Sequence, residues 1–566
     1  MKSHRVVAVI WCVCGLGVYG AELGMENAEA AHRLGRTQVW ALTLEQYLRE
    51  VVVGNETLQA RWLEARAARR RARGEWGAFE PEWFASAQRQ INERQNTVEQ
   101  QRSTLSGIFS ERNNVYQGGL ESLLPSGAKV RLGYTLRDLK NNLQSQPLFL
   151  SRGATNGEFV TFVGASVTQP LLKDAGPAAT LAALRIAALE SDIAFQEYRR
   201  QMMLTLAQAE DAYWNLFLAQ EQVRYFEDSL ATAEKLLQDN QKRLEAGRGS
   251  QLEVLEAEAG VALRRARLQE ARQRLESARS QVLTFCSRTT AEVPGGVVAL
   301  DAPRVNVAEP DLLELWREAW LWNPDYQIQR LKVMQEANRV GYQRNQRWPE
   351  LNLVGSYGFN GLGETPGDSW AMVEDGGFVS WSIGLELRMP VAGGIKARNQ
   401  LAAARLQYQA AELALREIER QIGNALEVAR QKFRAARAGI EGYQALVAFN
   451  QTLLESALAR LEVGKLDSRK VLEIEADLFE ARNQLAETLV QRQRALLELE
   501  VVSGRLLKQR NLEESRENLA AEVRVWMQQP AASTLTRADA VAPAGFETPE
   551  QQRARQALRK TLDSEP

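Results

Sequence analysis

The chain has 566 residues and a formal net charge of only -1 at pH 7, although 25% of its residues are charged. This balance argues against a nucleic-acid partner, which would need a concentrated basic surface, and the small number of prolines, 16, is typical of a chain of long helices. With only two histidines, His4 and His32, and no phosphate-binding glycine loop, the sequence predicts no enzyme activity, no cofactor and no metal site.

The N-terminus has the features of a secretory signal peptide. Lys2 and Arg5 precede the apolar stretch VVAVIWCVCGLGVYG, and small residues follow it. This order of a basic segment, an apolar segment and a small-residue site predicts a signal peptide over residues 1–20. Cleavage after Gly20 and cleavage after Ala21 both fit the pattern.

Cysteine usage predicts an exported protein without disulfides. Cys12 and Cys14 lie in the signal peptide, and neither stands in a lipoprotein-type cleavage box, so we expect no lipid anchor. Cys286 would be the only cysteine of the mature chain, which excludes an intrachain disulfide. Outside the signal peptide, no apolar stretch approaches the roughly 20 residues that a transmembrane helix needs.

Two copies of one pattern follow each other along the chain. The stretch RLEAGRGSQLEVLEAE at 243–258 matches RLEVGKLDSRKVLEIE at 460–475, and REVVVGN at 49–55 matches REAWLWN at 317–323. Two copies with so long a period indicate a duplicated domain rather than a solenoid. The predicted parts are an N-terminal segment at 21–39, a first repeat at 40–290, a linker at 291–310, a second repeat at 311–508 and a polar, disordered tail at 509–566.

Long helices are predicted in both repeats. From Leu401 to Leu461 apolar residues recur at alternating steps of three and four, which is the spacing of a coiled-coil seam. No proline interrupts 178–293 or 391–529. A helix from residue 172 to residue 246 would be roughly 110 Å long, far longer than a helix of an ordinary globular domain.

Between the long helical stretches the hydrophobic period changes to two. In the second repeat, ELNLVGSYGF (350–359) and FVSWSIGLELRMP (378–390) alternate apolar with polar or small residues over about ten positions, as membrane β-strands do. They predict a hairpin over about 349–389. The side chains expected to face lipid are Trp381, Ile383, Leu385 and Leu387.

The first repeat has a less regular counterpart. EFVTFVGASVTQP (158–170) predicts the second strand of a hairpin over about 81–169, and PEWFASAQRQ (81–90) is a weaker first strand. We interpret the extra residues 91–157 as an external loop with a hairpin of its own, with a further transmembrane hairpin as the alternative.

Four strands are too few to close a membrane barrel, because about eight is the practical minimum. An open sheet edge is not tolerated in lipid, so the strands predict a barrel shared among copies of the chain. The alternative is an exported, soluble coiled-coil scaffold protein whose strands form a small β-module.

Over residues 40–508 the sequence resembles the TolC-like outer-membrane efflux and secretion factors, through SVTQPLLKDAG (166–176) and the two glycine-containing stretches quoted above. The resemblance implies a membrane β-barrel plus all-α fold: a homotrimer with a twelve-stranded barrel, four strands per chain, in outer-membrane lipid, continuous with a long periplasmic α-helical barrel. It implies a passive exit duct for small molecules or proteins. Its expected partners are a periplasmic adaptor (membrane fusion protein) and an inner-membrane transporter of the RND, MFS or ABC type, and residues 21–39 would be periplasmic.

The same resemblance assigns roles at the two helix-reversing tips. Glycines are expected to supply the positive φ of each reversal, and the turns to dock the adaptor. The tip-turn residues are Gly247, Gly249, Gly464 and Lys465. The residues expected to line the periplasmic mouth as a gate are Glu253, Glu256, Leu466, Lys470 and Glu473.

The tips also depart from the family pattern. Leu466 stands where the family has an arginine, and Lys470 where it has an aspartate, so the arginine–aspartate latch of parts of the family is not reproduced. Lys465, Arg469 and Lys470 are the alternative partners for Glu253. A lysine at position 470 would weaken an acidic ring formed by Glu473, and the alternative for these acidic residues is an ordinary solvated helix face.

Overall fold

The computed structural model describes residues 39–98, 101, 107–142, 144, 157–247, 249–304, 308–391, 393–463 and 465–512. The chain divides into one unit at Met1–Leu506 and a second at Leu507–Pro566. Of the second unit only residues 507–512 are described, including most of the short helix α13 (Leu506–Gln509). The predicted signal peptide, almost all of the N-terminal segment and most of the C-terminal tail lie outside the described residues.

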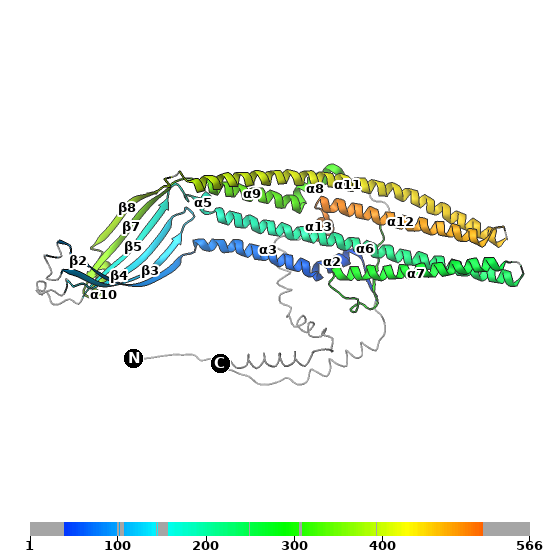
Figure 1. The fold of residues 1–566 in the computed structure, drawn as a ribbon, viewed down its shortest axis with the longest axis horizontal. Coiled ribbons are helices and arrows are strands. Elements are labelled where there is room, and N and C mark those ends of the chain that lie inside the picture. The colour runs from blue at the N-terminus through cyan, green and yellow to red at the C-terminus, as the bar shows by residue number, and fades with distance from the viewer. Residues whose placement is uncertain are drawn as a thin grey trace, which may run out of the picture. The chain divides into compact units, whose positions relative to one another are not determined.

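Four long helices form two antiparallel hairpins (Figure 1). They are α6 (Ala182–Glu245) with α7 (Gln251–Phe285), and α11 (Ile395–Glu462) with α12 (Ser468–Val502). With 64 and 68 residues, α6 and α11 are each roughly 100 Å long. The expected start at residue 172 is wrong, because Asp174 and Gly176 adopt positive φ and the short helix α5 (Pro177–Thr180) intervenes.

Each hairpin is accompanied by a pair of shorter helices. These are α2 (Leu44–Gly54) and α3 (Glu56–Gly74) in the first repeat, and α8 (Leu312–Trp322) and α9 (Pro324–Asn345) in the second. The predicted coiled-coil seam of α11 is buried: Ala429 and Phe433 are fully enclosed, and they pack with Leu315 of α8 and Leu499 of α12. The stretch predicted as a linker also contributes structure, because β6 (Val297–Ala299) pairs in parallel with β1 (Trp40–Leu42).

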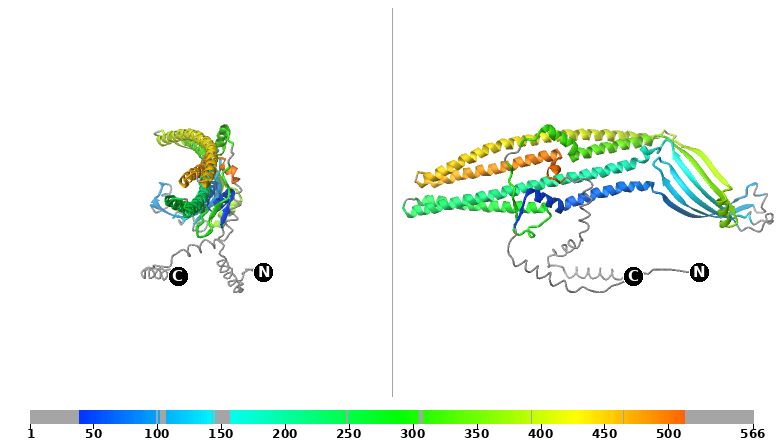
Figure 2. Two further views of the ribbon diagram at one scale, coloured as in Figure 1. Left: turned by 90° about the vertical axis from the view of Figure 1, so that its right-hand side faces the viewer. Right: turned by 180° about the vertical axis from the view of Figure 1, so that it is seen from behind.

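At the end of this unit opposite the tips of the two helical hairpins lies an antiparallel sheet (Figures 1 and 2). Its six described strands are ordered β2-β3-β4-β5-β7-β8. Their bounds are β2 (Glu82–Gln95), β3 (Ile108–Leu123), β4 (Lys129–Leu139), β5 (Glu158–Pro170), β7 (Glu350–Gly363) and β8 (Val379–Arg388). The 3₁₀ helix η1 (Glu75–Phe79) leads into β2, and α10 (Pro366–Glu374) lies between β7 and β8.

The expectation of four strands per chain is therefore wrong for this sheet. The first repeat supplies four strands instead of the single hairpin predicted over 81–169. The turn between β3 and β4 lies beside the helices, since Gly176 donates to the Ser126 carbonyl at 3.0 Å. Ser126 also contacts Gln169 at the end of β5 through a 3.3 Å hydrogen bond. Thus β3 and β4 run along the sheet between β2 and β5, which excludes the favoured external loop and agrees with the alternative of a further strand pair.

The two faces of the sheet differ in polarity across its full width. One row of paired residues is apolar from edge to edge: Trp83, Leu120, Leu132, Ala165, Tyr357 and Trp381. The row one residue away, on the opposite face, is polar: Glu82, Glu121, Arg131, Ser166, Ser356 and Ser382. Because a slip of one residue would exchange the faces of a strand, this agreement shows that all six strands share one apolar face and one polar face.

Candidate functional site at the helical tips

The tip of the first hairpin is a short turn that ends in a capped helix. Gly247 has φ +69°, as expected for a left-handed turn residue. The same prediction is wrong for Gly249, which is not among the positive-φ residues. A Cβ at Gly249 would lie 3.0 Å from the Leu244 nitrogen, so close packing explains that glycine. Gly464, in the second tip, lies outside the described residues.

Glu253 caps α7 and does not pair with a cation of the second tip. Its carboxylate accepts a hydrogen bond from the Ser250 backbone at 3.3 Å, and the Ser250 hydroxyl caps the same helix in return. This capping box satisfies amide groups that the helix start leaves without intrahelical partners. Among the described ion pairs, none joins Glu253 to Lys465, Arg469 or Lys470, so the structure does not bear out that pairing.

The charged gate candidates of the second tip form an exposed network. Lys470 Nζ lies 2.9 Å from a Glu473 oxygen, and Arg469 bridges Glu473 at 3.6 Å and Glu256 at 4.0 Å. The hydrogen bond from Lys470 lowers the pKa of Glu473, and the bond to Glu473 raises the pKa of Lys470. Glu473 therefore stays ionised, with the positive charge of Lys470 beside it.

Leu466 has a packing environment instead of a polar one. Together with Leu472 it is half-buried against a core cluster made of Leu236, Ala457, Leu461 and Val471. This cluster joins α6 of the first hairpin to α11 and α12 of the second. At position 465 the structure gives one backbone contact: the Lys465 amide donates to the Arg460 carbonyl at 2.9 Å and closes the end of α11.

Polar side chains reinforce the joint between the hairpins. Ser468 donates to Asn240 at 2.7 Å in a buried contact, and Asn240 in turn donates to the Glu253 carbonyl at 3.2 Å. Arg243 reaches the carbonyl of Leu461 at 2.8 Å. The two tips of one chain are thus held together by hydrogen bonds and by the apolar cluster.

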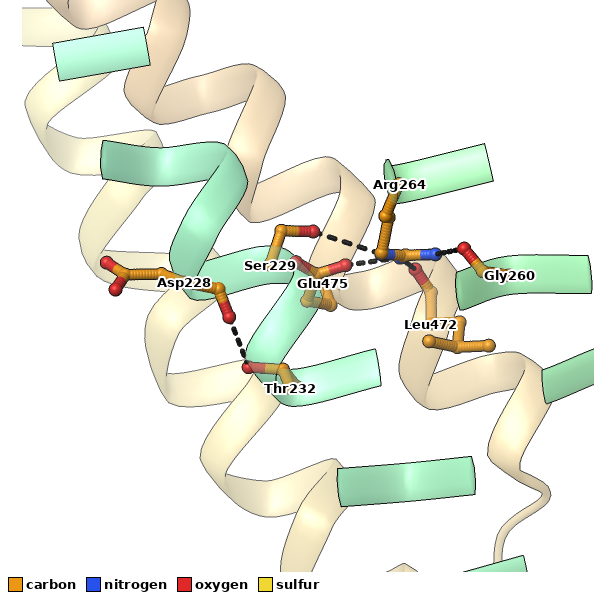
Figure 3. Close-up of polar contacts among 7 residues, drawn as sticks. All are labelled: Asp228, Ser229, Thr232, Gly260, Arg264, Leu472 and Glu475. Carbon is orange, nitrogen blue, oxygen red and sulfur yellow. Dashed lines mark hydrogen bonds and ion pairs between the residues drawn. The ribbon is translucent and has the colours of Figure 1, made fainter. Parts of the chain in front are cut away.

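A nearly buried ion pair between the hairpins lies further along the helices and joins Arg264 of α7 to Glu475 of α12 (Figure 3). Arg264 Nε also donates to the Ser229 hydroxyl of α6 at 3.0 Å, and its other nitrogens reach the carbonyls of Gly260 and Leu472 at 3.4 Å. The side chains of Arg264 and Glu475 are only 11% and 7% exposed. We call Arg264, Glu475 and Ser229 the hairpin latch.

The latch was not predicted, although the sequence carries a signal for it. Val261, Arg264 and Leu268 follow one another at steps of three and four, so a cation interrupts an apolar seam. Glu475 likewise follows the buried Val471 by four residues and precedes Leu478 by three. A buried charge is costly unless it is paired, so complementary charges within two seams indicate a contact. Which seams face each other depends on the packing of the hairpins.

Other chemistries have little support in the part of the chain that the structure describes. No cluster of three or more His, Cys, Asp or Glu residues there has the arrangement of a metal site. Across the same residues, none of the helices combines the length and apolar character needed to cross a membrane. Cys286 is buried and free, and its burial raises the pKa of the thiol to about 12.

Taken together, a sheet with one apolar and one polar face, joined to long helical hairpins with packed tips, defines an outer-membrane channel protein. The chain belongs to the outer membrane efflux protein family, whose model matches residues 152–285 and 315–505, more than half of the sequence. The family comprises channel proteins rather than enzymes, and the outer-membrane location agrees with the expectation from sequence.

Comparisons with individual proteins agree. The proteases secretion protein PrtF of Dickeya chrysanthemi is 25% identical over 57% of this chain and 68% of its own length. The alkaline protease secretion protein AprF of Pseudomonas aeruginosa is 23% identical, over 51% of this chain but only 59% of AprF. The structure of the outer-membrane channel OprN superposes with a TM-score of 0.58 at 18% identity, covering 81% of this chain and 89% of OprN, which supports the fold.

Proposed function

We propose that this protein is a passive exit duct through the outer membrane, formed by three copies of the chain. The observation that carries the proposal is the continuity of the two-faced sheet with the helical hairpins. The apolar face would contact lipid, the polar face would line water, and helices roughly 100 Å long would extend the duct away from the membrane. Trp381, Ile383, Leu385 and Leu387, all on one face of β8 and all well exposed in the single chain, are the proposed lipid contacts.

The relatives support two related uses of such a duct. One use is protein secretion, since the names of PrtF and AprF refer to protease secretion. The other is efflux, which is part of the name of the matching family. We propose that a periplasmic adaptor docks at the tip turns around Gly247, Gly249, Gly464 and Lys465. An inner-membrane transporter of the RND, MFS or ABC type would supply the energy, since a passive duct performs no chemistry of its own.

We further propose that the hairpin latch helps to hold the periplasmic mouth closed. Arg264 and Glu475 lie on different hairpins, so moving the second hairpin away from the first would break their ion pair. Removing one partner of a buried pair typically costs about 3–5 kcal/mol, because the other charge remains buried and unpaired. A docking partner that separates the hairpins would instead expose both charges to water, so it must offset only the smaller net free energy of the intact pair. Glu253, Glu256, Leu466, Lys470 and Glu473 would surround the mouth below the latch.

Membrane extraction followed by channel recording tests the proposed function. The full chain should fractionate with outer membranes, require detergent for release, and migrate as a heat-sensitive oligomer in SDS gels. After reconstitution in planar bilayers it should conduct ions. A monomer released by osmotic shock without detergent would instead support the soluble scaffold alternative and would contradict a duct.

A further inference from the structure

Among the strands that the structure describes, neither edge strand of the sheet has a partner on its outer side, and the two edge strands run in opposite directions. Strands β2 and β8 form the two edges, and the side chains of both are exposed along almost their whole length. Adjacent strands in this sheet are all antiparallel, and the number of described strands is even. An edge β8 can therefore pair with the β2 of an identical neighbour in the same antiparallel sense, without a break in the pattern.

The face polarity persists up to both edges. Trp83 on β2 and Trp381 on β8 end the apolar row, and their side chains are 81% and 71% exposed. Glu82 and Ser382 end the polar row on the opposite face. Unpaired backbone at a sheet edge is not tolerated in lipid. A neighbouring strand of the same two-faced type would pair this backbone and would leave Trp83 and Trp381 in contact with lipid on the apolar face.

The pairing is also staggered as barrel closure requires. Pro170, the last residue of β5, pairs with Asn352, two residues inside β7, and Lys129, the first residue of β4, pairs with Thr168, two residues inside β5. Glu82, the first residue of β2, pairs with Glu121, two residues inside β3. At the end of the sheet nearest the helices, the strand ends are therefore staggered in one direction from β8 to β2. A closed barrel needs such a stagger between neighbouring strands, called shear.

We infer that the barrel contains six strands from each chain, eighteen in the trimer, and that it closes through β8 of one chain and β2 of the next. This inference rests on the proposed function, a duct formed by three copies of the chain. With strands about 4.8 Å apart and tilted by about 40°, eighteen strands give a barrel roughly 36 Å across, against roughly 24 Å for twelve. Barrels of 16–18 strands leave an aqueous channel, so the outer opening would be wide enough that the helical tips set the limit on passage.

Disulfide trapping distinguishes the two closures. Ser382→Cys on β8 should cross-link to Ser86→Cys, Gln88→Cys or Gln90→Cys on the same face of a neighbour's β2. With both cysteines in every chain, boiled non-reducing gels should show covalent dimers and trimers and no larger species. The matched set pairs Ser382→Cys with Gly133→Cys, Thr135→Cys or Arg137→Cys, which lie on the same face of β4 at the same distances from the helix-proximal strand end. In this set β4 would be the closing edge, as it would be if only four strands entered the barrel.

Controls separate this inference from the proposed function. Ser382→Cys with Arg89→Cys places the thiols on opposite faces and should not cross-link, and single-cysteine variants should remain unlinked. Cross-linking of β8 to β4 in an oligomeric membrane protein would overturn the eighteen-stranded barrel while leaving the duct intact. An oligomer in which none of the three β2 positions links to Ser382→Cys would also overturn it. A soluble, unlinked monomer would overturn both proposals.

Discussion

Asn55 and Asn323 perform the same two tasks in the two halves of the chain. Each caps the second helix of a pair, accepting from the Leu58 amide at 3.1 Å and from the Tyr326 amide at 3.0 Å. The side-chain amide of each also donates to the end of a long hairpin, Asn55 to the Phe285 carbonyl at 3.1 Å and Asn323 to the Val502 carbonyl at 2.8 Å. These asparagines tie each short helix pair to the last turn of its hairpin.

Replacing either asparagine should destabilise the helical part. Asn323→Ala removes a helix cap and leaves a carbonyl without its donor in a nearly buried position, so a loss of about 1–3 kcal/mol is expected. Thermal unfolding of the detergent-extracted protein measures it. Asn338→Ala is the matched control: this half-buried asparagine of α9 donates only to the Met334 carbonyl of its own helix in an exposed contact, and its loss should change stability little. Equal stability of the two variants would show that the cap is unimportant.

Breaking the hairpin latch should open the mouth. Glu475→Gln leaves the buried Arg264 without its counter-charge, and we expect a higher single-channel conductance together with reduced stability. The double variant Arg264→Met/Glu475→Leu removes both charges, so it leaves no unpaired buried charge and should be more stable than Glu475→Gln.

The control for the latch is an exposed ion pair of similar geometry. Arg265 and Glu234 lie 2.8 Å apart within one hairpin, with side chains 65% and 46% exposed. Glu234→Gln should therefore leave conductance unchanged, because exposed pairs contribute little. If Glu475→Gln conducts no better than Glu234→Gln, the latch does not restrict the mouth.

The charge of the second tip should control ion preference. Lys470→Met removes the hydrogen bond that contributes most to lowering the pKa of Glu473, and leaves Arg469 as the remaining cation beside the carboxylate. Near neutral pH we expect a higher cation-to-anion permeability ratio than in the unmodified channel. Charge reversal by Glu473→Lys should lower that ratio, and an unchanged ratio in both variants would place Glu473 away from the ion path.

The pH dependence of this effect has a definite sign. A carboxyl whose folded pKa is lowered keeps its charge, and its favourable interaction, as the pH falls below the ordinary glutamate range. Unmodified channels should therefore hold their selectivity to a lower pH than Lys470→Met channels, in which Glu473 protonates nearer its usual pKa. Reversal potentials measured between pH 7 and pH 4 show at which pH each channel loses its cation selectivity, and this pH should be lower for the unmodified channel.

The two faces of β8 should respond differently to an added charge. Leu385→Asp places a carboxylate on the face proposed to contact lipid, and we expect impaired assembly in the outer membrane. Gly384→Asp places it on the opposite face, where an added Cβ meets no other atom within 4 Å, and should be milder. The amount of heat-sensitive oligomer in membranes is the measurement, and equal losses would contradict the proposed orientation of the strand.

Periodicity allowed much of this architecture to be predicted. The steps of three and four in α11 placed Ala429 and Phe433 in the core, and the period of two in β7 and β8 located both strands within a few residues. These signals are local, because the side chains of a regular element repeat with its own geometry. The matching segments around Asn55 and Asn323 likewise showed the duplication.

Long-range packing decided the remainder. In β2 and β3 the alternation is irregular, and only pairing with β4 and β5 shows that they extend the sheet, which raises the strands per chain from four to six. The partner of Arg264 could not be read from the chain either, because Glu475 lies 211 residues away on another hairpin. From the sequence alone, the long helices and strands β7 and β8 could be predicted together with their amphipathic faces. The tertiary structure decided the number of strands in the sheet and which edges and buried charges meet, because those contacts depend on how separate elements pack.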